Sequence, residues 1–485
     1  MTDSISGRGR WLALIVLCLG VLMIVLDTTI VNVALPSIRS DLGYTETSLV
    51  WVVNAYMLTF GGFLLLGGRL GDLFGHKKLF LFGLTFFTLA SLACGFANTQ
   101  ERLIAARAVQ GLGGAVVNAV SLSLIMNLFT DSAERAKAMG VFGFVCSAGG
   151  SIGVFLGGLL TSTLNWHWIF LVNLPIGIVV YILCVYLLPS RSQRAQSGHL
   201  DVGGALSITT ALMLAVYAIV NGNEAGWTST QTMGLLGAAV ALLALFIWIQ
   251  ARVREPLVPL TLFRLRNVVV SNVVGVLWAA SMFAWFFIAA LYMQRVLAYT
   301  PLQVGLAFLP ANIIMGIFSL GISARLVMRF GLRPPLTVGM ILAVIGLFAF
   351  ARAPAGGSFV VDVLPAMILF GFGAGIAFNP LLLAAMSDVS PSESGLASGV
   401  VNTAFMMGGS VGLAILASGA AARTSGLLTT GVDPVTALNS GYHLAFALGG
   451  GCSFVAAGLS AIFLRPMQQS SESGVGAVSP AHGGM

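Results

Sequence analysis

The chain has 485 residues, of which 58% are hydrophobic and 8% are charged, and its formal net charge is +7. A soluble protein carries roughly 25% charged residues, so this chain cannot cover a water-facing surface and most of its apolar side chains must face lipid. The basic residues lie in short segments between apolar runs, which argues against nucleic-acid binding.

Fourteen apolar runs are long enough to cross a membrane as helices, which takes about 20 residues. They cover residues 11–34, 48–68, 79–97, 103–127, 138–160, 169–188, 202–220, 233–250, 268–292, 303–324, 335–352, 362–386, 395–419 and 441–464. The first run is too long for the apolar part of a signal peptide, and no A-x-A-like site follows it, so we interpret it as a retained helix. The predicted fold is an all-α integral membrane protein with fourteen transmembrane helices.

The loops predict an orientation. If the N-terminus lies inside the cell, most of the 23 Lys and Arg residues fall in cytoplasmic segments, few fall outside, and Arg107 alone lies within a span. This asymmetry follows the positive-inside rule and explains the net charge. It predicts that both termini are cytoplasmic.

Two pairs of similar segments indicate an internal duplication. Gly68–Lys77 resembles Ala324–Arg333, and Ala138–Gly157 resembles Ala397–Leu416, at nearly equal separations along the chain. Matches in the same orientation predict two parallel six-helix repeats related by an axis along the membrane normal. The predicted organisation is a cytoplasmic tail (1–10), a six-helix bundle (11–188), a linker with two inserted helices (189–267), a second six-helix bundle (268–464) and a disordered cytoplasmic tail (465–485).

The first run contains Asp27, the only one of the 16 acidic residues that lies well inside a predicted span. A charged group at the bilayer centre costs roughly 2.5–3.5 kcal/mol on insertion scales, so such a group usually titrates or pairs. Proton uptake and release would suit it. A structural, hydrogen-bonded acid is the alternative.

The fourth run contains Arg107, which shares one helical face with Gly111, Gly114 and Asn118. Glycines on that face allow a neighbouring helix to approach closely. From the rise of about 1.5 Å per residue, Asp27 and Arg107 both lie in the outer half of the membrane. A direct or water-bridged contact between them is therefore possible, and a purely structural Arg107 is the alternative.

The segment between the second and third runs, Gly68–Lys78, carries glycines for a tight turn and basic residues that hold it in the cytoplasm. Asp72 in this loop would be stabilised near a helix N-terminus, for instance the serine-rich start of the thirteenth run. An ordinary solvated loop is the alternative.

The ninth run carries a one-sided stripe that includes Trp278, Met282 and Trp285. Together with Gln110 and Asn118 of the fourth run, these residues are candidates for the lining of a substrate cavity. Core packing or lipid contact is an equal alternative for the stripe.

These segments resemble the major facilitator superfamily, and within it the fourteen-helix drug:proton antiporter branch. The resemblance rests on Leu26–Pro36, Gly68–Lys77, Arg107–Gly113 and the glycine-rich Gly149–Gly158, with weaker support from Trp166–Gly177 and Arg254–Arg264. The chain departs from the family pattern at four positions: Leu73, His76, Val154 and His167. Val154 stands where exporters usually have proline, which bears on the direction of transport.

The resemblance implies proton-coupled efflux of small amphipathic compounds, such as antibiotics, by alternating access. It makes Asp27 the proton-linked acid and Arg107 its coupling partner. It also implies a conformational latch formed by Gly68, Asp72, Gly75 and Lys77.

The expected partners are a small-molecule substrate, protons and the lipid bilayer of a bacterial inner membrane, and we expect a monomer without cofactor, metal or nucleic acid. The five cysteines lie in apolar runs without metal-ligand spacing and are interpreted as packing residues. No HExxH or GxSxG motif or cluster of acids indicates an enzyme. An exporter or importer of one metabolite remains an alternative, as does a sensor, although no segment is long enough for a signalling domain.

Overall fold

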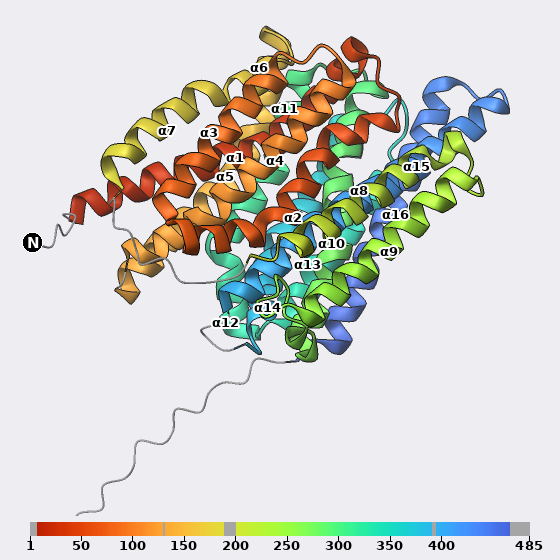
Figure 1. Cartoon of the computed structure of the whole chain (residues 1–485). Coiled ribbons are helices and arrows are strands. Elements are labelled where there is room, and N and C mark those ends of the chain that lie inside the picture. The colour runs from red at the N-terminus through yellow and green to blue at the C-terminus, as the bar shows by residue number, and fades with distance from the viewer. Residues whose placement is uncertain (1–6, 130, 189–199, 390–393, 466–485) are drawn as a thin grey trace, which may run out of the picture.

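The computed structural model describes residues 7–129, 131–188, 200–389 and 394–465, and within these ranges it is helical without β-strands (Figure 1). The first helices are α1 (Gly7–Leu42), η1 (Ser48–Val50), α2 (Trp51–Phe74), α3 (His76–Gly95), α4 (Gln100–Leu128), α5 (Ser132–Thr163), α6 (Trp168–Leu171), α7 (Asn173–Leu187), α8 (Val202–Ala225) and α9 (Thr230–Arg252). The remaining helices are η2 (Leu260–Arg264), α10 (Arg266–Arg295), α11 (Pro301–Ile317), η3 (Phe318–Ile322), α12 (Ser323–Phe330), α13 (Arg333–Phe350), η4 (Phe359–Val363), α14 (Leu364–Met386), α15 (Ser394–Thr429) and α16 (Pro434–Phe463).

Twelve helices in the described ranges are long and apolar enough to cross a membrane, and Pro301–Ile317 is a shorter apolar helix. The chain is therefore a multi-pass membrane protein. Several helices extend beyond the predicted runs, because hydropathy detects only their apolar parts. The first helix continues through Pro36 to Leu42, since helices within membranes tolerate proline where neighbouring groups satisfy the backbone.

The predicted helix at 169–188 is confirmed as one apolar span, Trp168–Leu187, with a one-residue break at Val172 between α6 and α7. Pro175 has no N–H to donate to the carbonyl of Leu171, so the regular pattern of backbone bonds is interrupted there. The break places Asn173 at the first residue of α7.

Local sequence also explains where a helix starts. Thr300 and Gln303, for example, form a capping box before α11.

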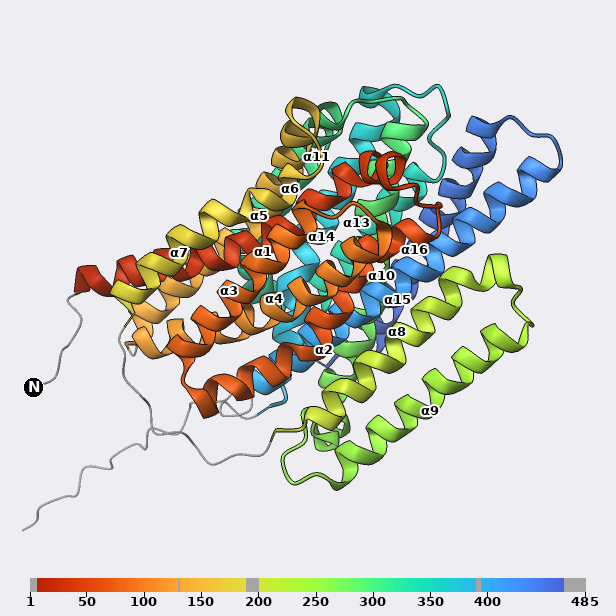
Figure 2. The ribbon, with the colours of Figure 1, turned by 45° about the horizontal axis from the view of Figure 1, so that its top comes forward.

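The helices pack as two groups, which Figures 1 and 2 show from two directions. In the first group, α1 packs on α5 and α7, and α4 packs on α2 and α3. In the second group, α10 packs on α15 and α16, and α14 packs on α11 and α13. The groups meet through α5 against α11 and through α2 against α15, while the α8–α9 hairpin lies beside them, with α8 on α2 and α15.

Glycines permit the closest contacts in both groups. A Cβ on Gly111 of α4 would lie 2.4 Å from the carbonyl oxygen of Tyr56 in α2, and no side chain fits at that distance. Gly371 of α14 has the same relation to Ala311 of α11, with a Cβ 2.6 Å from the carbonyl oxygen. In each group, a glycine therefore allows two helices to pack with their backbones in close contact.

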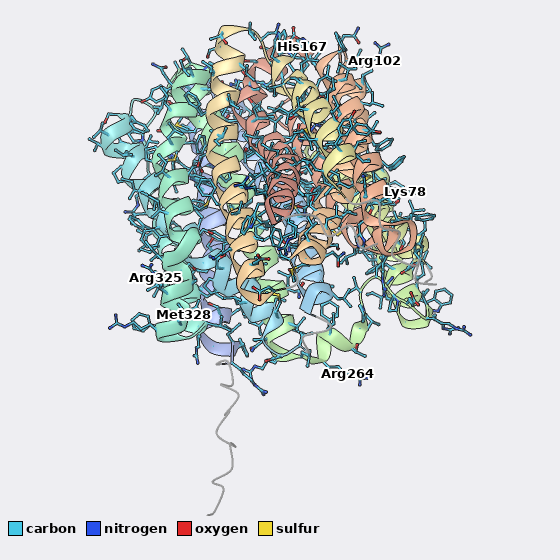
Figure 3. The ribbon with its side chains drawn as sticks, turned by 90° about the vertical axis from the view of Figure 1, so that its left-hand side faces the viewer. Lys78, Arg102, His167, Arg264, Arg325 and Met328 are labelled. Carbon is cyan, nitrogen blue, oxygen red and sulfur yellow. The ribbon has the colours of Figure 1, made fainter. Side chains whose placement is uncertain are left out.

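The two ends of the bundle differ in their charged residues, as Figure 3 shows. Arg102 and His167 lie at one end, called here the Arg102 end. Arg264 and Arg325 lie at the other, called the Arg325 end, and Lys78 lies between the two levels at the right-hand side of the view.

Polar contacts join the two groups near the Arg102 end. Glu46, in the loop after α1, binds Arg39 at 3.1 Å and also pairs with Arg295 at the end of α10. Asn54 Nδ2 of α2 donates to the carbonyl of Ser410 in α15 at 3.0 Å. Among the described residues, these polar contacts thus link the two helix groups at the Arg102 end.

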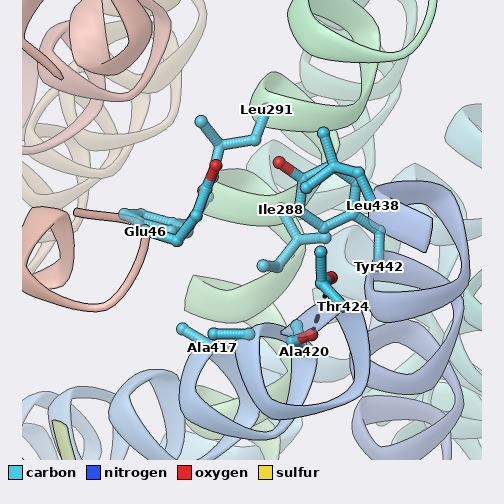
Figure 4. A pocket seen from close by; sticks show the side chains of 10 residues that line it. Glu46, Ile288, Leu291, Ala417, Ala420, Thr424, Leu438 and Tyr442 are labelled. Carbon is cyan, nitrogen blue, oxygen red and sulfur yellow. Dashed lines mark hydrogen bonds between the residues drawn. The ribbon is translucent and has the colours of Figure 1, made fainter. Parts of the chain in front are cut away.

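Glu46 also borders a small pocket between α10, α15 and α16. Figure 4 shows Ile288, Leu438, Thr424 and Tyr442 around it. In the neighbouring loop, burial raises the pKa of the Tyr44 hydroxyl well above its usual range, with Glu101 contributing. Tyr44 therefore keeps its proton, and its hydroxyl donates to the carbonyl of Gln100 at 3.0 Å.

Candidate functional site

Asp27 and Arg107 form an ion pair in the interior of the first group. Asp27 comes from the middle of α1 and Arg107 from α4, and their side chains are 0% and 1% exposed. Nη1 of Arg107 donates to Oδ2 of Asp27. The contact that the sequence left open is therefore direct. Because both charges are removed from water, the pair must be held by further hydrogen bonds to be tolerated.

Arg107 is fixed by groups on three sides. Its Nε donates to the carbonyl of Val52 at 2.9 Å, and its Nη1 also donates to Oε1 of Gln110 at 2.7 Å. The guanidinium carbon lies 4.4 Å from the ring centroid of Tyr56, a cation–π contact. The close approach of α2 at Gly111 brings Val52 and Tyr56 within reach.

The second oxygen of Asp27 is held by two side-chain amides. Oδ1 accepts from Nε2 of Gln110 at 2.7 Å and from Nδ2 of Asn173 at 3.2 Å. Both amides also donate to Oγ of Ser91, at 3.1 and 3.0 Å, and Ser91 donates to the carbonyl of Phe170 at 2.9 Å. We call Asp27, Ser91, Arg107, Gln110 and Asn173 the Asp27 cluster.

The geometry of the cluster suits a carboxyl group that changes its charge. Three N–H donors face Asp27. The hydrogen bonds in this structure therefore fit the charged carboxylate, which can only accept. In a low-dielectric interior an unpaired charge is costly, so a change at Asp27 must alter the contacts of Arg107 as well. The arrangement can thus link a proton to the positions of α1, α3, α4 and α7.

The cluster contains residues that the sequence analysis assigned differently or missed. Gln110 was expected in a substrate cavity, but it is fully buried and bonded to Asp27. Ser91 and Asn173 were not expected at all. Asn173 lies within the segment Trp166–Gly177 that supports the family resemblance, so that segment was a usable signal, whereas Ser91 has none in the sequence.

The aromatic stripe of α10 packs inside the second group. Trp278 and Trp285 both stack on Phe370 of α14, with ring centroids 5.5 and 4.2 Å apart, and both are buried. Their faces are covered by protein in this structure. Met282 and Asn118 are partly exposed.

The residues expected to form a latch lie where α2 meets α3. Gly75 separates the helices with φ +91°, a conformation that favours glycine, and a Cβ on Gly68 would meet open space. Nζ of Lys77 donates to the carbonyls of Val185, at 2.9 Å, and Leu188 at the end of α7. The side chain of Asp72 lies outside the described part of the structure.

The fold defines a helical membrane protein, and the site within it is a buried acid–arginine pair. Comparisons with known proteins show the family to which the chain belongs. A model of the Major Facilitator Superfamily matches residues 17–413. Puromycin resistance protein pur8 of Streptomyces alboniger is 36% identical over 479 residues, 97% of this chain and 95% of that protein. Cephamycin export protein CmcT of Amycolatopsis lactamdurans is 36% identical over 417 residues, 85% of this chain and 86% of that protein.

Lincomycin resistance protein of Streptomyces lincolnensis is 34% identical over 421 residues, 86% of this chain and 85% of that protein. Among solved structures, a mutant of the nucleoside transporter NupG superposes with a TM-score of 0.64 at 13% identity, over 94% of this chain and 100% of that chain. The xylose transporter XylE of E. coli, in an inward-open conformation, gives 0.62 at 16% identity, over 95% of this chain and 98% of that chain. The chain belongs to the Major Facilitator Superfamily.

Proposed function

We propose that the protein is a proton-coupled exporter, a drug:H⁺ antiporter that expels small amphipathic compounds such as antibiotics by alternating access. The observation that carries the proposal is the buried Asp27–Arg107 pair with its amide donors, because transport against a gradient needs a site that can gain and lose a proton. Relatives named for puromycin and lincomycin resistance and for cephamycin export support the compound class. Asp27 is the proton carrier, and Arg107 couples it to substrate.

Efflux is tested with the purified protein in proteoliposomes under an imposed pH gradient. We expect uphill accumulation of an antibiotic that collapses when the gradient is dissipated. The compound is first selected from a susceptibility panel in an efflux-deficient bacterial host. A protein that exchanges only one metabolite across the membrane, with no response to any antibiotic in the panel, would be a metabolite transporter instead.

We further propose fourteen membrane-spanning segments in two parallel repeats. Two further spans add to the twelve candidate spans. One is α5, a helix of 32 residues, and the other is α11 continued through η3 and α12. The repeats are 11–188 and 268–464, with α8 and α9 inserted between them in 189–267. The equivalent packing of the two groups and the equivalent contacts of Gly111 and Gly371 support this division.

The proposed orientation places the Arg325 end in the cytoplasm of a bacterial cell, with both termini on that side. We expect single cysteines at Lys78 or Arg325, introduced into a variant free of native cysteines, to resist an impermeant thiol reagent in intact cells. A cysteine at Arg102 should be labelled readily. The opposite labelling pattern would invert the orientation.

The loop at Gly75 is proposed to act as a conformational latch through Asp72, with Gly68, Gly75 and Lys77 shaping it. We expect Asp72→Asn to slow transport without lowering expression, since Asp72 biases conformations and does not bind substrate. Transport rates in proteoliposomes test this, and rates equal to those of the unmodified protein would remove Asp72 from the mechanism.

Substrate is proposed to bind between the two groups, where Asn118 and Met282 are partly exposed. The binding surface is supported by Gln110, Trp278 and Trp285. Their side chains do not contact substrate in this proposal, because they are engaged in contacts within the protein. The pocket beside Glu46 lies on the outward path, and Arg295 must release Glu46 for the path to open. We propose that the exporter works as a monomer.

A further inference from the structure

One side-chain amide in the Asp27 cluster, that of Asn173, has an oxygen without a hydrogen-bond partner among the described residues. Asn173 is 1% exposed, and its Nδ2 donates to both Asp27 and Ser91. Its Oδ1 is buried and has no hydrogen-bond partner among the described residues. An unsatisfied buried acceptor costs about 1–3 kcal/mol, so its position beside a titratable carboxyl calls for an explanation.

The hydrogen-bond inventory around Asp27 shows what the cluster lacks. Arg107 offers only donors. The Oε1 of Gln110 already accepts from Arg107 at 2.7 Å and from Sγ of Cys94 at 3.6 Å. If Asp27 gains a proton, its O–H needs an acceptor. Among the described side chains that hydrogen-bond to Asp27, only Asn173 has an unpaired acceptor.

We propose that Asn173 is a positioning residue that responds to the protonation state of Asp27. When Asp27 is charged, the amide nitrogen of Asn173 donates to it, as in this structure. When Asp27 is protonated, the amide turns by half a turn and its Oδ1 accepts from the O–H of Asp27. The inference rests on the proposed function, in which Asp27 carries the proton.

The two orientations of the amide are closely balanced. Turning Asn173 leaves its nitrogen in the place of the unpaired oxygen, so one unpaired polar atom replaces another. The orientations therefore differ in what they offer to Asp27 and to Ser91, and the charge of Asp27 selects between them. An amide whose two orientations differ by so few hydrogen bonds can follow the carboxyl.

The turn has a consequence for the neighbouring helices. Ser91 loses the donor Nδ2 of Asn173 and faces Oδ1 instead, so its hydroxyl is drawn away from the carbonyl of Phe170, to which it donates at 2.9 Å. Phe170 lies in α6, just before the break at Val172. Protonation of Asp27 is thereby transmitted from α1 to α3 and to the α6–α7 junction.

An unpaired oxygen alone would not assign this role. Asn439 of α16 is also buried, its Nδ2 donates to the carbonyl of Ala353 at 3.2 Å, and its Oδ1 is also unpaired. The hydrogen-bond partner of its Nδ2 is a backbone carbonyl, which does not titrate. Asn439 is therefore a matched control for Asn173, with the same side chain and burial but without a carboxyl partner.

The test is infrared difference spectroscopy of the purified full-length protein between high and low pH, with and without ¹³C-labelled asparagine. The carboxyl band of Asp27 is identified by its loss in Asp27→Asn. We expect this band to rise together with a change in an asparagine carbonyl band. Asn173→Leu should remove the asparagine change, and Asn439→Leu should keep it.

Asn173→Leu should also move the pH profile of the carboxyl band to higher pH by roughly one unit. The charge-assisted bond that Asn173 gives to the carboxylate is stronger than the neutral bond it gives to the acid, so losing both penalises the charged form more. An asparagine without contact to the Asp27 carboxyl would leave this profile in place, and the asparagine carbonyl change separates an amide that turns from one that stays a donor. The labelled unmodified protein shows whether any asparagine responds at all, and Asn173→Ser supplies the assignment if Asn173→Leu fails to fold.

A carboxyl band that rises without any asparagine change would overturn the role of Asn173 and leave Asp27 as the proton carrier. An asparagine change that Asn439→Leu removes would do the same. A carboxyl band that persists in Asp27→Asn would show that another group takes the proton, and would overturn both the assignment of Asp27 and the inference built on it.

Discussion

Replacing Asp27 with asparagine is expected to abolish uphill export while substrate still binds. The amide keeps the size and hydrogen-bonding capacity of a protonated carboxyl, so the binding surface between the two groups is preserved. The variant cannot exchange a proton, so binding and release are no longer linked to the pH gradient. The measurements are uphill efflux in proteoliposomes and proton release by the detergent-solubilised protein when a drug is added.

Asp201→Asn is the matched control for this experiment. Asp201 is another buried acid, 5% exposed, but it caps α8 by accepting from the backbone N–H of Gly204 at 2.7 Å. Asparagine is an equally good helix cap. The variant loses the bond that Asp201 accepts from Nε2 of Gln250 at 2.5 Å, which should lower stability, but proton-driven export should remain. If Asp27→Asn still releases protons and pumps uphill, a group other than Asp27 carries the proton.

Replacing Arg107 with leucine is expected to destabilise the protein by about 3–5 kcal/mol, because it leaves a buried carboxylate without its partner. Asp27 escapes this penalty only by holding a proton, so the loss should grow as pH rises and shrink as pH falls. Thermal unfolding in detergent at several pH values measures it. Transport should be lost as well, since Asp27 would stay protonated.

Two further variants separate charge from geometry. In Asp27→Asn/Arg107→Leu no charge remains, so much of the stability should return, although transport should not. Arg107→Lys keeps the charge, but one ammonium cannot reproduce the separate bonds to Val52, Asp27 and Gln110. It should fold and transport poorly. An equal loss of stability in Arg107→Leu whether residue 27 is Asp or Asn would show that the ion pair is not its cause.

The ion pair could be predicted because charge is rare in membrane spans. Asp27 and Arg107 stand out in apolar runs, and a rough depth from the helical rise placed them at a similar level. Their contact follows from how α1 and α4 pack. The roles of both residues in proton coupling remain predictions.

The rest of the cluster could not be predicted from one sequence. Serine and asparagine are unremarkable in apolar helices, and the position of Asn173 depends on the break before α7 that Pro175 causes. Gln110 lies one turn from Arg107, yet its orientation is set by Asp27 and Ser91 on other helices. Such contacts depend on tertiary packing, and helical periodicity in the sequence carries no information about it.

The helix ends and the stripe of α10 show the same limit. Hydropathy located the apolar runs, but it did not show that α1 extends to Leu42 or that α16 begins at Pro434. Periodicity showed that Trp278 and Trp285 share a face. It could not show that this face packs on Phe370.

As the proposed proton carrier, Asp27 limits how steep a gradient the exporter can build. With one carboxyl, we expect one proton to enter for each compound that leaves. A proton-motive force of 100 mV then supplies about 2.3 kcal/mol per cycle, which sustains a concentration ratio of roughly 50-fold for a neutral compound. For a monovalent cation the two charges cancel, so the membrane potential contributes nothing and only the pH difference drives export. The protein should therefore protect a cell with a high membrane potential better against neutral compounds than against cationic ones.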